Sequence, residues 1–471
     1  MSRASLIYDA LPRAGQTFAV NLYGLRNRRR ISRWKRFLSS VEFTERLPRP
    51  EMERYMTERL LKMLAHAVRT VPFYEPHREL LSLLENSNAD AFDALTRFPV
   101  VTKSDVLADP KAFRSTARSL GPLARAVTSG TTGTPFATWM TREALDAGDA
   151  LWWRRNVWSG YRDGEWIARL VGDPVVPLRD ASPSKPWRVS WTDRRIYMST
   201  YHLSPETATR SLDMLERRRP EYIMGYPSSL EILAGFCEDE GRTLSWRPKA
   251  VWFSSEPMFE HQRDVIGRVF GNNIVGLFGS AERIVSASQC EEGSYHLSTV
   301  DGYVEGQFGR LDVHATARVT TLLNPAMPLI RFELGDAIAP MPEYVCACGR
   351  TLPVIDPVIT KHEDQLETPS GRRVSGSVLT WAIKDIRGVR RTQIVQVSKS
   401  TVEVHIDADA GVFEKQGKKL AARLRELTFG ELEIACIRDT SIEVMKSGKT
   451  RFVINRTKAR RESEPAGRDD S

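Results

Sequence analysis

The residues best suited to chemistry in the first part of the chain form the loop 128–135, which reads TSGTTGTP. Gly130 and Gly133 allow a tight turn and let a ligand approach the backbone closely. Short hydroxyl donors stand beside successive backbone N–H groups at Ser129, Thr131, Thr132 and Thr134. Many converging donors without carboxylates suit an oligophosphate. The loop therefore predicts a phosphate-binding site, with an ordinary polar hairpin turn as the alternative.

A second short motif, SGKT at residues 447–450, resembles the end of a Walker A phosphate-binding loop. The full pattern needs a glycine five residues before Gly448, and Glu443 stands at that position. The motif also lies near the end of the sequence, whereas a Walker A loop follows an early strand. These departures exclude a P-loop nucleoside triphosphatase and leave Lys449 without a role on this pattern alone.

Three cysteines and one histidine form a group with metal-binding chemistry. Cys290 and His296 lie close together in the sequence, and Cys346 and Cys348 are separated by a single residue. Three thiolates and one imidazole make a closed tetrahedral set of the kind that holds structural zinc. The sequence therefore predicts a Zn²⁺ site, with buried free thiols as the alternative.

Length and composition describe a soluble globular protein with more than one domain. The chain has 471 residues, of which 41% are hydrophobic and 27% are charged, and this length exceeds what one small core organises. No apolar run approaches the ~18 residues needed to span a bilayer, and the first residues lack a signal-peptide pattern. Five cysteines are too few for a disulfide framework, so we expect a reducing, cytoplasmic location, with Cys237 and Cys436 in the core.

The formal charge of +9 is concentrated in a basic run at residues 26–36, RNRRRISRWKR, and in the last residues. Apolar side chains interrupt the arginines, so residues 1–45 are predicted to form a basic amphipathic arm that lies on a membrane or on the protein body. A solvated face is the plain interpretation, and peripheral contact with anionic lipid at the inner membrane face, or with an acidic polymer, is the alternative. No zinc-finger, homeodomain or RNA-recognition pattern accompanies the charge, so nucleic-acid binding is not expected.

Strands and helices alternate through the middle of the chain. Residues 51–70 have apolar side chains at helical spacing before Pro72, and Thr102 or Ser104 is placed to cap a second, short helix. Further helices are expected over residues 142–158 and 260–270, and strands over residues 168–172, 222–224, 249–254, 273–278, 319–323 and 329–332. This alternation predicts an α/β layer architecture.

The composition changes at residues 358–369, where the chain becomes polar and charged. Beyond this segment, we expect a helix over residues 413–427 and strands over residues 393–397, 401–406, 433–437 and 442–445. Such a unit is a small α+β domain, so we place a boundary near Glu363, with residues 46–362 as the large domain and 363–456 as the small one. Residues 457–471 have no apolar periodicity and are expected to be disordered.

Nine short motifs, taken in order, resemble the adenylate-forming superfamily, and within it the phenylacetate–CoA ligase branch with its CapK-like members associated with surface polysaccharide. The motifs are VPFY (71–74), FPVVTK (98–103), TSGTTGTP (128–135), GYPSSLEILA (225–234), SSEP (254–257), FGSAE (278–282), MPLIRFELGD (327–336), CACGRTLP (346–353) and SGKTRFVINR (447–456). The resemblance implies a large N-terminal adenylate-forming domain with β-sheets flanked by helices, and a small α+β C-terminal domain that moves between the two steps of the reaction.

The resemblance further implies ATP-dependent activation of a carboxylic acid. The carboxylate attacks the α-phosphate of ATP to give an acyl-adenylate and pyrophosphate, and a nucleophile, usually the thiol of coenzyme A, then displaces AMP. The loop 128–135 would hold the β- and γ-phosphates, and Lys449 would be the catalytic lysine that stabilises charge in the transition state. Glu282 would act in catalysis by holding Mg²⁺, which prefers carboxylate oxygen.

Residues that contact the nucleotide are also implied by the resemblance. The adenine would be surrounded by two short segments, which are Ser255, Glu256 and Pro257, and Phe278, Gly279 and Ser280. Asp336 would accept hydrogen bonds from the ribose hydroxyls, and Lys361 would contact the ribose. The family has a Gly-Arg pair before its hinge carboxylate, whereas this chain has Thr360, Lys361 and then Glu363. Lysine does not reproduce the arginine fork, so the hinge is where this chain departs from the family.

The acid pocket has the fewest sequence signals. In the family it lies between the tyrosine–proline segment and the adenine strands, where this chain has Tyr226, Pro227, Trp252 and Phe253. These aromatics would suit an aryl or otherwise apolar acid, with core packing as the alternative. Basic side chains that could meet a carboxylate are Arg169, His202 and Arg331.

The main prediction is an AMP-forming ligase that makes an acyl-CoA thioester from a small carboxylic acid, with ATP, Mg²⁺ and coenzyme A, and with a structural Zn²⁺ like that of some relatives in this branch. Transfer of the acyl group to an amine or hydroxyl in surface polysaccharide biosynthesis is one alternative. A non-catalytic nucleotide-binding scaffold is another. The acid, the acceptor and the formation of a homodimer are left open.

Overall fold

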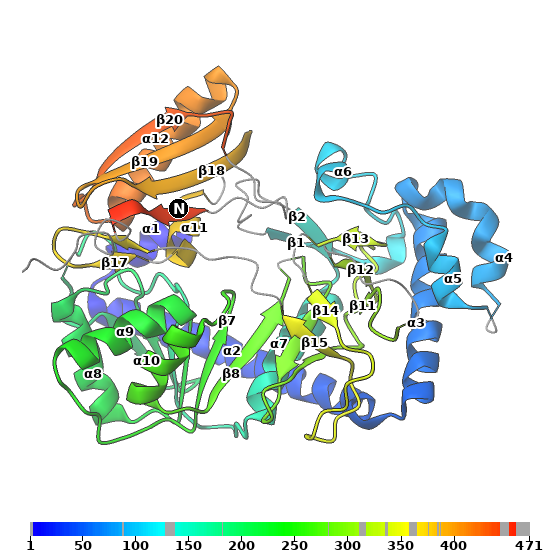
Figure 1. Ribbon diagram of the computed structural model, residues 1–471, viewed down its shortest axis with the longest axis horizontal. Helices are drawn as coiled ribbons and strands as arrows, with labels where there is room; N and C mark the ends of the chain where they lie inside the picture. The colour runs from blue at the N-terminus through cyan, green and yellow to red at the C-terminus, as the bar shows by residue number, and fades with distance from the viewer. Residues whose placement is uncertain are drawn as a thin grey trace, which may run out of the picture.

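The computed structural model shows a mixed α/β protein, as the sequence predicted (Figure 1). The structure describes residues 3–86, 89–127, 137–180, 182–280, 282–309, 317–334, 338–357, 365–374, 376–383, 386, 388–442 and 452–457. A large sheet with helices on both faces forms one part, and a group of helices beside short strands forms a second. A small α+β unit near the C-terminal end forms the third.

Ten strands form the large sheet, in the order β14-β15-β10-β9-β8-β7-β6-β3-β5-β4. Its centre is parallel and consists of β8 (Ile274–Gly279), β7 (Ala250–Ser254), β6 (Tyr222–Gly225), β3 (Ile167–Leu170) and β5 (Arg195–Met198). Antiparallel strands flank this centre, namely β4 (Trp187–Ser190), β9 (Ser286–Gln289), β10 (Tyr295–Leu297), β15 (Val354–Pro357) and β14 (Ile338–Pro340). Strands covered on both faces form continuous apolar runs, so β6, β7 and β8 were predictable, whereas arginines interrupt β4 and β5.

Neighbouring residues of the parallel strands point to opposite faces of the sheet. One face is covered by α8 (Pro205–Arg218), α9 (Pro227–Asp239) and α10 (Glu260–Phe270). The other face is covered by α2 (Arg13–Val41) and α7 (Arg142–Trp158). Phe253 packs on the first face and its neighbour Trp252 on the second. The sheet is thus buried between two helical layers.

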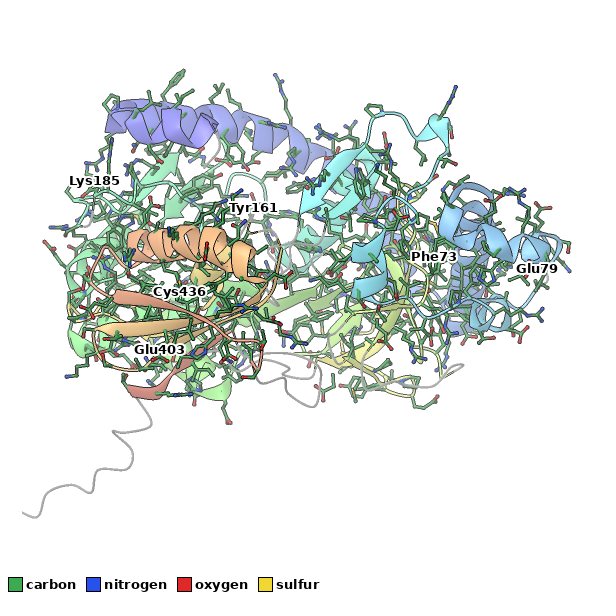
Figure 2. The ribbon with its side chains drawn as sticks, turned by 90° about the horizontal axis from the view of Figure 1, so that it is seen from above. Phe73, Glu79, Tyr161, Lys185, Glu403 and Cys436 are labelled. Carbon is green, nitrogen blue, oxygen red and sulfur yellow. The ribbon has the colours of Figure 1, made fainter. Side chains whose placement is uncertain are left out.

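The basic N-terminal arm lies on the protein body. After α1 (Arg3–Ala10), the long helix α2 packs across α7 and β4, and the short helix η1 (Glu42–Arg46) follows. Gly24 is buried where α2 crosses the turn between β4 and β5, and a Cβ atom there would lie 2.7 Å from Asp193 Oδ1. Figure 2 shows α2 along one edge of the molecule. One side of the predicted arm is therefore packed against protein.

A second hydrophobic cluster forms around α3 (Arg49–Thr70), which was predicted over residues 51–70. The helices that follow are η2 (Pro72–Leu80), α4 (Leu81–Leu84), α5 (Ala91–Thr96), α6 (Lys103–Ala108) and η3 (Arg118–Leu120). The strands are the hairpin β1 (Ala124–Val127) and β2 (Ala137–Met140), and the sheet β11 (Gly302–Val304), β12 (Arg318–Thr321) and β13 (Phe332–Glu333). Thr102 caps α6 in a capping box with Asp105, as predicted. The strand predicted over residues 329–332 is wrong except at Phe332.

The C-terminal unit has its own hydrophobic cluster. Its elements are β16 (Leu366–Glu367), β17 (Arg373–Val374), α11 (Gly376–Ile383), β18 (Val389–Gln396), β19 (Thr401–Ala408), α12 (Ala410–Leu427), β20 (Glu433–Arg438) and β21 (Val453–Asn455). Tyr201 from the large sheet region belongs to the same cluster. The strand β21 was not predicted, and residues 443–445 of the last predicted strand lie outside the described residues. The boundary near Glu363 also falls outside them and stays a prediction.

Candidate nucleotide site, cavity and metal centre

Three of the motif segments follow three adjacent parallel strands. β6 leads to Tyr226, β7 leads to Ser255, and β8 leads to Ser280. The register places Gly225 beside Phe253, and a similar pairing joins β7 to β8, so the three strands end at the same edge of the sheet. Loops at the carboxyl edge of a parallel sheet are the usual place for ligands. The fold therefore brings these distant segments together where a nucleotide and an acid could meet.

The segment after β7 is held by the helix that follows β6. Glu256 accepts hydrogen bonds from Ser228 N at 2.9 Å and from Ser228 Oγ at 2.8 Å, in the first turn of α9. A carboxylate at a helix N-terminus is stabilised by the free N–H groups there. Ser255 has a φ of 73°, in the left-handed region that residues other than glycine rarely adopt. The Glu256 side chain therefore has a structural role in fixing this turn.

The segment after β8 is anchored by packing. Phe278 is half-buried and packs against the cluster around α3. Gly279 is exposed beside the Trp152 indole, where a Cβ atom would lie 3.2 Å from Nε1. Ser280 Oγ accepts a hydrogen bond from Ile284 N at 3.2 Å. Close approach of the backbone to Trp152 thus favours glycine at position 279.

Glu282 is close to a lysine from another motif. Burial lowers the pKa of Lys103, and the Glu282 carboxylate opposes this shift. Lys103 is the last residue of FPVVTK, and only its place in that motif could have marked it as a site residue. A cation bound by Glu282 would therefore sit in a region that already holds one positive charge.

The remaining predicted nucleotide ligands lie outside the described residues. They are Ser129, Gly130, Thr131, Thr132, Gly133, Thr134, Asp336, Lys361 and Lys449. The flanking strands β1 and β2 are described and pair as an antiparallel hairpin, with Val127 opposite Ala137. The roles of these nine residues stay predictions.

A cavity of about 420 Å³ lies beside the ends of β6 and β7, where Tyr226, Ser254 and Ser255 line it. Its other walls come from α2, α7, β3, β5 and β8, and the residues from α2 are Tyr23, Asn27, Arg30, Ile31 and Trp34. This spacing places them on one side of the helix. The volume is typical of small-molecule sites. The N-terminal arm is thus part of the wall of a candidate ligand site, which the sequence did not predict.

Two residues predicted for the acid pocket line this cavity, namely Tyr226 and Arg169. Two others belong to the core, as the alternative interpretation had it. Trp252 stacks on Tyr222 with ring centroids 4.3 Å apart, and Phe253 packs against the helices on the opposite face of the sheet. The wall of the cavity is aromatic as predicted, but most of its aromatic residues are others, namely Tyr23, Trp34, Trp152, Trp153 and Tyr197.

Three further predicted residues lie away from the cavity. Pro227 is buried at the start of α9. His202 is buried beside the Phe429 ring, with centroids 5.1 Å apart, and burial lowers the pKa of its imidazole to about 4. Arg331 pairs with Glu305 at 2.8 Å. None of the three contributes to the cavity wall among the residues that the structure describes.

Sequence reasoning missed three arginines that line the cavity, namely Arg155, Arg195 and Arg283. They come from α7, from β5 and from the loop after β8. Arg283 pairs with Asp149 at 2.7 Å. No short motif contains these residues, because they meet only after the sheet and its covering helices have formed.

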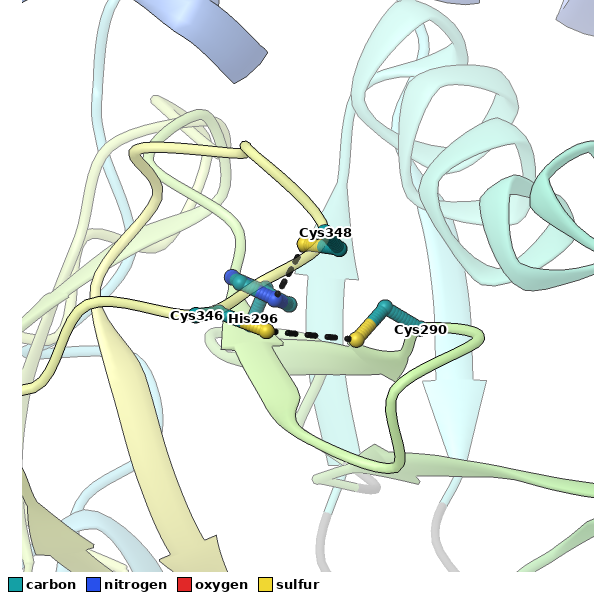
Figure 3. Close-up of side chains that lie close together, drawn as sticks. All are labelled: Cys290, His296, Cys346 and Cys348. Atoms are coloured by element: carbon teal, nitrogen blue, oxygen red, sulfur yellow. Dashed lines mark hydrogen bonds between the residues drawn. The ribbon is translucent and has the colours of Figure 1, made fainter.

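The four predicted metal ligands come together, as Figure 3 shows. Their ligand atoms all lie within 4.8 Å of one another. Cys290 Sγ and Cys346 Sγ are 3.7 Å apart, and Cys348 Sγ is 3.3 Å from His296 Nε2. Tetrahedral zinc with Zn–S bonds of ~2.3 Å separates its sulfur ligands by ~3.8 Å. The donor set and its spacing therefore fit Zn²⁺.

The surroundings of the cluster prepare His296 as a ligand. His296 Nδ1 is 3.2 Å from the Leu352 carbonyl oxygen, so an N–H there can donate and leave Nε2 directed to the thiols. Burial lowers the pKa of His296, which favours the neutral ring that binds metal. The ring also contacts Trp158, with centroids 5.9 Å apart and planes at 87°. The other two cysteines are in apolar contacts, with Cys237 in α9 and Cys436 in β20.

The outer side of α2 carries exposed apolar residues next to arginines. Phe18, Leu22 and Leu25 have exposed fractions of 71%, 60% and 50%, and Arg26 and Arg29 are exposed beside them. Within the described part of the chain, no helix combines the length and the apolar character that a bilayer crossing requires.

Comparison with known proteins relates the chain to two curated relatives. Residues 366–456 match the family model of the CapK C-terminal domain. The chain is 22% identical to Protein CapK of Staphylococcus aureus over 370 residues, which cover 77% of this chain and 81% of that protein. It is 26% identical to phenylacetate–coenzyme A ligase of Thermus thermophilus over 353 residues, which cover 68% of this chain and 73% of that protein.

Solved structures with the same fold include 2-hydroxyisobutyryl-CoA ligase. Its complex with 2-HIB-AMP and CoA in the thioesterification state aligns with a TM-score of 0.51 at 19% identity, covering 89% of this chain and 94% of that one. Its postadenylation state with R3-HIB-AMP aligns with a TM-score of 0.50 at 20% identity, covering 89% and 92%. At this identity, the likeness concerns the fold.

Proposed function

We propose that this CapK-like and phenylacetate–CoA ligase-like chain of the adenylate-forming superfamily uses ATP to convert a carboxylic acid into an acyl-adenylate. The observation that carries this proposal is the convergence of three motif segments at the carboxyl edge of β6, β7 and β8, beside a cavity of about 420 Å³. Adenylation needs a nucleotide surface next to an acid pocket, and this edge supplies a place for each.

In the first step, an oxygen of the acid attacks the α-phosphorus of ATP. A new O–P bond forms, the bond to the β-phosphate oxygen breaks, and pyrophosphate leaves with the electron pair. We assign the β- and γ-phosphates to the loop 128–135, the adenine to the backbone of Ser255–Pro257 and to Phe278, and the ribose to Asp336. Lys449 would stabilise the charge that develops between the attacking carboxylate and the α-phosphate.

In the second step, the thiol of coenzyme A attacks the acyl carbon of the adenylate. The C–S bond forms, the C–O bond to AMP breaks, and the thiol proton is released. Both 2-hydroxyisobutyryl-CoA ligase and phenylacetate–coenzyme A ligase are named for this acceptor. We therefore propose coenzyme A as the acceptor, with the C-terminal unit changing position between the two steps.

Two metal ions belong to the proposal. Glu282 would hold Mg²⁺, which neutralises phosphate charge when bound. Zn²⁺ would join Cys290, His296, Cys346 and Cys348, and its contribution would be structural because all four positions are protein ligands. Metal analysis of protein purified under reducing conditions should find one zinc per chain, and protein without stoichiometric zinc would favour free thiols.

Exchange of labelled pyrophosphate into ATP, dependent on an added acid, tests the first step directly. We expect exchange with at least one acid of a broad panel, and a loss of about 100-fold or more in Lys449→Ala. Lys446→Ala is a matched control three residues away on the same segment and should exchange at the normal rate. Absence of exchange with every acid would support a nucleotide-binding scaffold, and full exchange in Lys449→Ala would contradict its catalytic role.

Transfer of the acyl group to an amine or hydroxyl is the second candidate. The match of residues 366–456 to the CapK C-terminal domain favours it, as does the departure of Thr360 and Lys361 from the family hinge. Release of AMP that requires coenzyme A would support the thioester. Release that ignores coenzyme A but responds to an amino sugar or a polysaccharide precursor would support the second acceptor.

We also propose that the outer side of α2 contacts an anionic membrane surface. Phe18, Leu22 and Leu25 are spaced to lie on one side of the helix, and exposed arginines beside them complement lipid phosphates. The full chain should sediment with vesicles that contain phosphatidylserine and less with neutral vesicles. Replacing the three apolar residues by serine should abolish this, whereas Val345→Ser, at an exposed apolar residue elsewhere, should not. Equal sedimentation of both variants would contradict the proposal.

A further inference from the structure

The wall of the cavity contains more arginines than carboxylates. Its charged residues are Arg30, Arg155, Arg169, Arg195 and Arg283, with Asp149, Asp173 and Asp193. Five arginines against three aspartates leave a formal balance of two positive charges. A pocket for an apolar acid would hold few polar groups. This wall sets eight charged side chains among six aromatic and four aliphatic ones, so it favours an anionic ligand that also has an apolar part.

Three of these arginines form ion pairs with two aspartates. Arg30 and Arg283 both pair with Asp149, the second at 2.7 Å. Arg169 pairs with Asp173 at 3.2 Å. These ion pairs hold α2, α7 and the end of β3 in the wall of the cavity. Because Arg30 and Arg283 share Asp149, these ion pairs leave one positive charge uncompensated.

Arg155 and Arg195 have no carboxylate partner among the described residues. Their exposed fractions are 2% and 3%. Arg155 donates a hydrogen bond to the carbonyl oxygen of Phe253. Arg195 donates to the Asp193 carbonyl oxygen at 3.0 Å, and its guanidinium lies 5.4 Å from the centre of the Trp153 ring. A buried charge without a counter-ion is unfavourable, so both guanidinium groups favour a bound anion.

Three other residues in the wall have buried N–H groups with no hydrogen-bond partner in the part of the chain that the structure describes. They are Asn156 at Nδ2, Trp34 at Nε1 and Trp153 at Nε1. Asn156 is fully buried, and its Oδ1 already accepts from Arg155 Nε at 3.1 Å. Buried donors normally have a partner. Oxygen atoms of a polar ligand would supply such acceptors.

The two unpaired arginines lie at different ends of the cavity. Arg155 contacts the carbonyl of Phe253 in β7, next to the segment assigned to adenine, whereas Arg195 begins β5. β6 and β3 lie between β7 and β5, and Arg195 is level with Ala250, three residues before Phe253. At the usual dimensions of a sheet, the two ends are therefore separated by roughly 14 Å across the strands and about 10 Å along them. An acid that reacts at the β7 end can therefore place a second group near Arg195.

We propose that the acid activated by this protein carries a second anionic group, and that Arg195 binds this group at the end of the cavity formed by β5 and α2. The inference rests on the proposed adenylation, because it assigns the acid pocket of that reaction. An acid with a single carboxylate places that carboxylate at the reacting end, near β7, and therefore has no anionic group for Arg195. Near Arg195, the Asn27 amide and the Tyr197 hydroxyl both donate to Asp193 Oδ2 at 3.1 Å, which leaves the Arg195 guanidinium as the donor for an anion.

Matched pairs of acids that differ only in the second carboxylate test the inference on the full chain. The pairs are dodecanedioate with dodecanoate, and tetradecanedioate with tetradecanoate, because the two carboxylates of each diacid are far enough apart to reach both ends of the cavity. We measure both thermal stabilisation by each acid, which needs no turnover, and acid-dependent pyrophosphate exchange. The dianions should stabilise the protein and support exchange at least about 10-fold more efficiently than their monoanionic partners. Equal or better performance of the monoanions would overturn the inference while leaving the proposed adenylation in place.

Variants at neighbouring arginines locate the anion. Arg195→Gln should raise the KM for the dianion by about 10-fold or more, with the KM for ATP nearly unchanged, and should remove the preference over the monoanion. Arg195→Lys keeps the charge and should keep part of the preference. The control is Arg194→Gln, since Arg194 is exposed over Trp166 and outside the cavity. Stabilisation by dianions without any exchange would sustain the inference and reject the adenylation, and no stabilisation by either dianion would overturn the inference.

Discussion

Arg154 and Arg155 are neighbours on α7, yet they belong to two different polar regions. Arg154 pairs with Glu45 at 3.4 Å and lies near Trp158, which contacts His296 of the cysteine cluster. Arg155 lines the cavity. One region is compact and drawn from two short segments, whereas the other is assembled from seven elements. The cysteine cluster can be recognised from the types of its residues, whereas the cavity forms only when the sheet and its covering helices come together.

The two regions also differ in how their arginines are paired with carboxylates. On the metal side, Glu45 accepts from Trp158 Nε1 at 3.1 Å and is 3.8 Å from Arg350. On the cavity side, two arginines have no carboxylate partner among the described residues. The metal side should therefore respond to substitution mainly through stability, and the cavity side mainly through binding.

Removal of a cluster ligand is expected to have the largest effect. Cys346→Ser should lose the zinc and destabilise the protein by about 4 kcal/mol or more, because loss of a metal belongs to the most damaging class of changes. Metal content and chemical denaturation measure this. Cys436→Ser, at a cysteine outside the cluster, is the control and should keep its zinc. Equal metal content and equal stability of the two variants would show that the cysteine cluster holds no stabilising metal.

The two arginines on α7 allow a direct test of the contrast. Arg154→Met leaves the half-buried Glu45 carboxylate without its nearest arginine and should cost about 3 kcal/mol of unfolding free energy. Arg155→Met removes a charge that has no ion pair and should cost about 1 kcal/mol, while it impairs acid-dependent exchange. Denaturation and exchange assays on both variants should therefore rank them in opposite orders. The same ranking in both assays would contradict the distinction between the two regions.

A buried carboxylate on the metal side should make stability depend on pH. Burial raises the pKa of Asp301 to about 6, and Ser286 and Arg154 oppose the shift. Between about pH 4 and 6, the folded protein retains a proton that the unfolded chain has released, so stability falls as the pH rises through this window, by up to about 3 kcal/mol.

Denaturation midpoints of Asp301→Asn and of the unchanged protein, compared from pH 4 to 7, isolate this contribution. The difference between the two proteins should grow in favour of the variant as the pH rises and then level off above pH 6. The exposed Asp264→Asn is the control and should follow the unchanged protein. A difference that stays constant over the whole range would exclude the assignment.

A smaller effect than those of the metal ligands, Arg154 and Asp301 is expected where α2 crosses the sheet. Gly24→Ala places a Cβ atom 2.7 Å from Asp193 Oδ1, within a contact that also includes Ser190 and Thr192. The overpacking should cost about 2 kcal/mol and should also weaken binding of the acid, because α2 forms a cavity wall. Gly411→Ala, in a helix with open space around the glycine, should instead be neutral or stabilising. Unchanged acid binding in Gly24→Ala would separate α2 from the site.

Residue types made part of this molecule predictable. The cluster was predictable because thiols and imidazole have few other uses together, and α3 and α7 were predictable because their apolar residues recur at helical spacing. The strands β6, β7 and β8 were predictable as apolar runs. The cavity was not, because Arg155 and Arg195 acquire meaning only when α7 and β5 face each other. Trp252 and Phe253 were wrongly predicted to line the acid pocket, because an aromatic residue on a strand does not indicate which face of the sheet it occupies.

Tyr201 connects the C-terminal unit to the large sheet. Its ring belongs to the hydrophobic cluster of that unit, while its hydroxyl donates to the Gly172 carbonyl at 2.9 Å, next to Val171 and Asp173 of the cavity wall. Any swing of the unit must therefore either withdraw an aromatic ring from an apolar core or drag the loop after β3 along with it. Movement of the C-terminal unit and release of a ligand from the cavity would then be coupled through Tyr201.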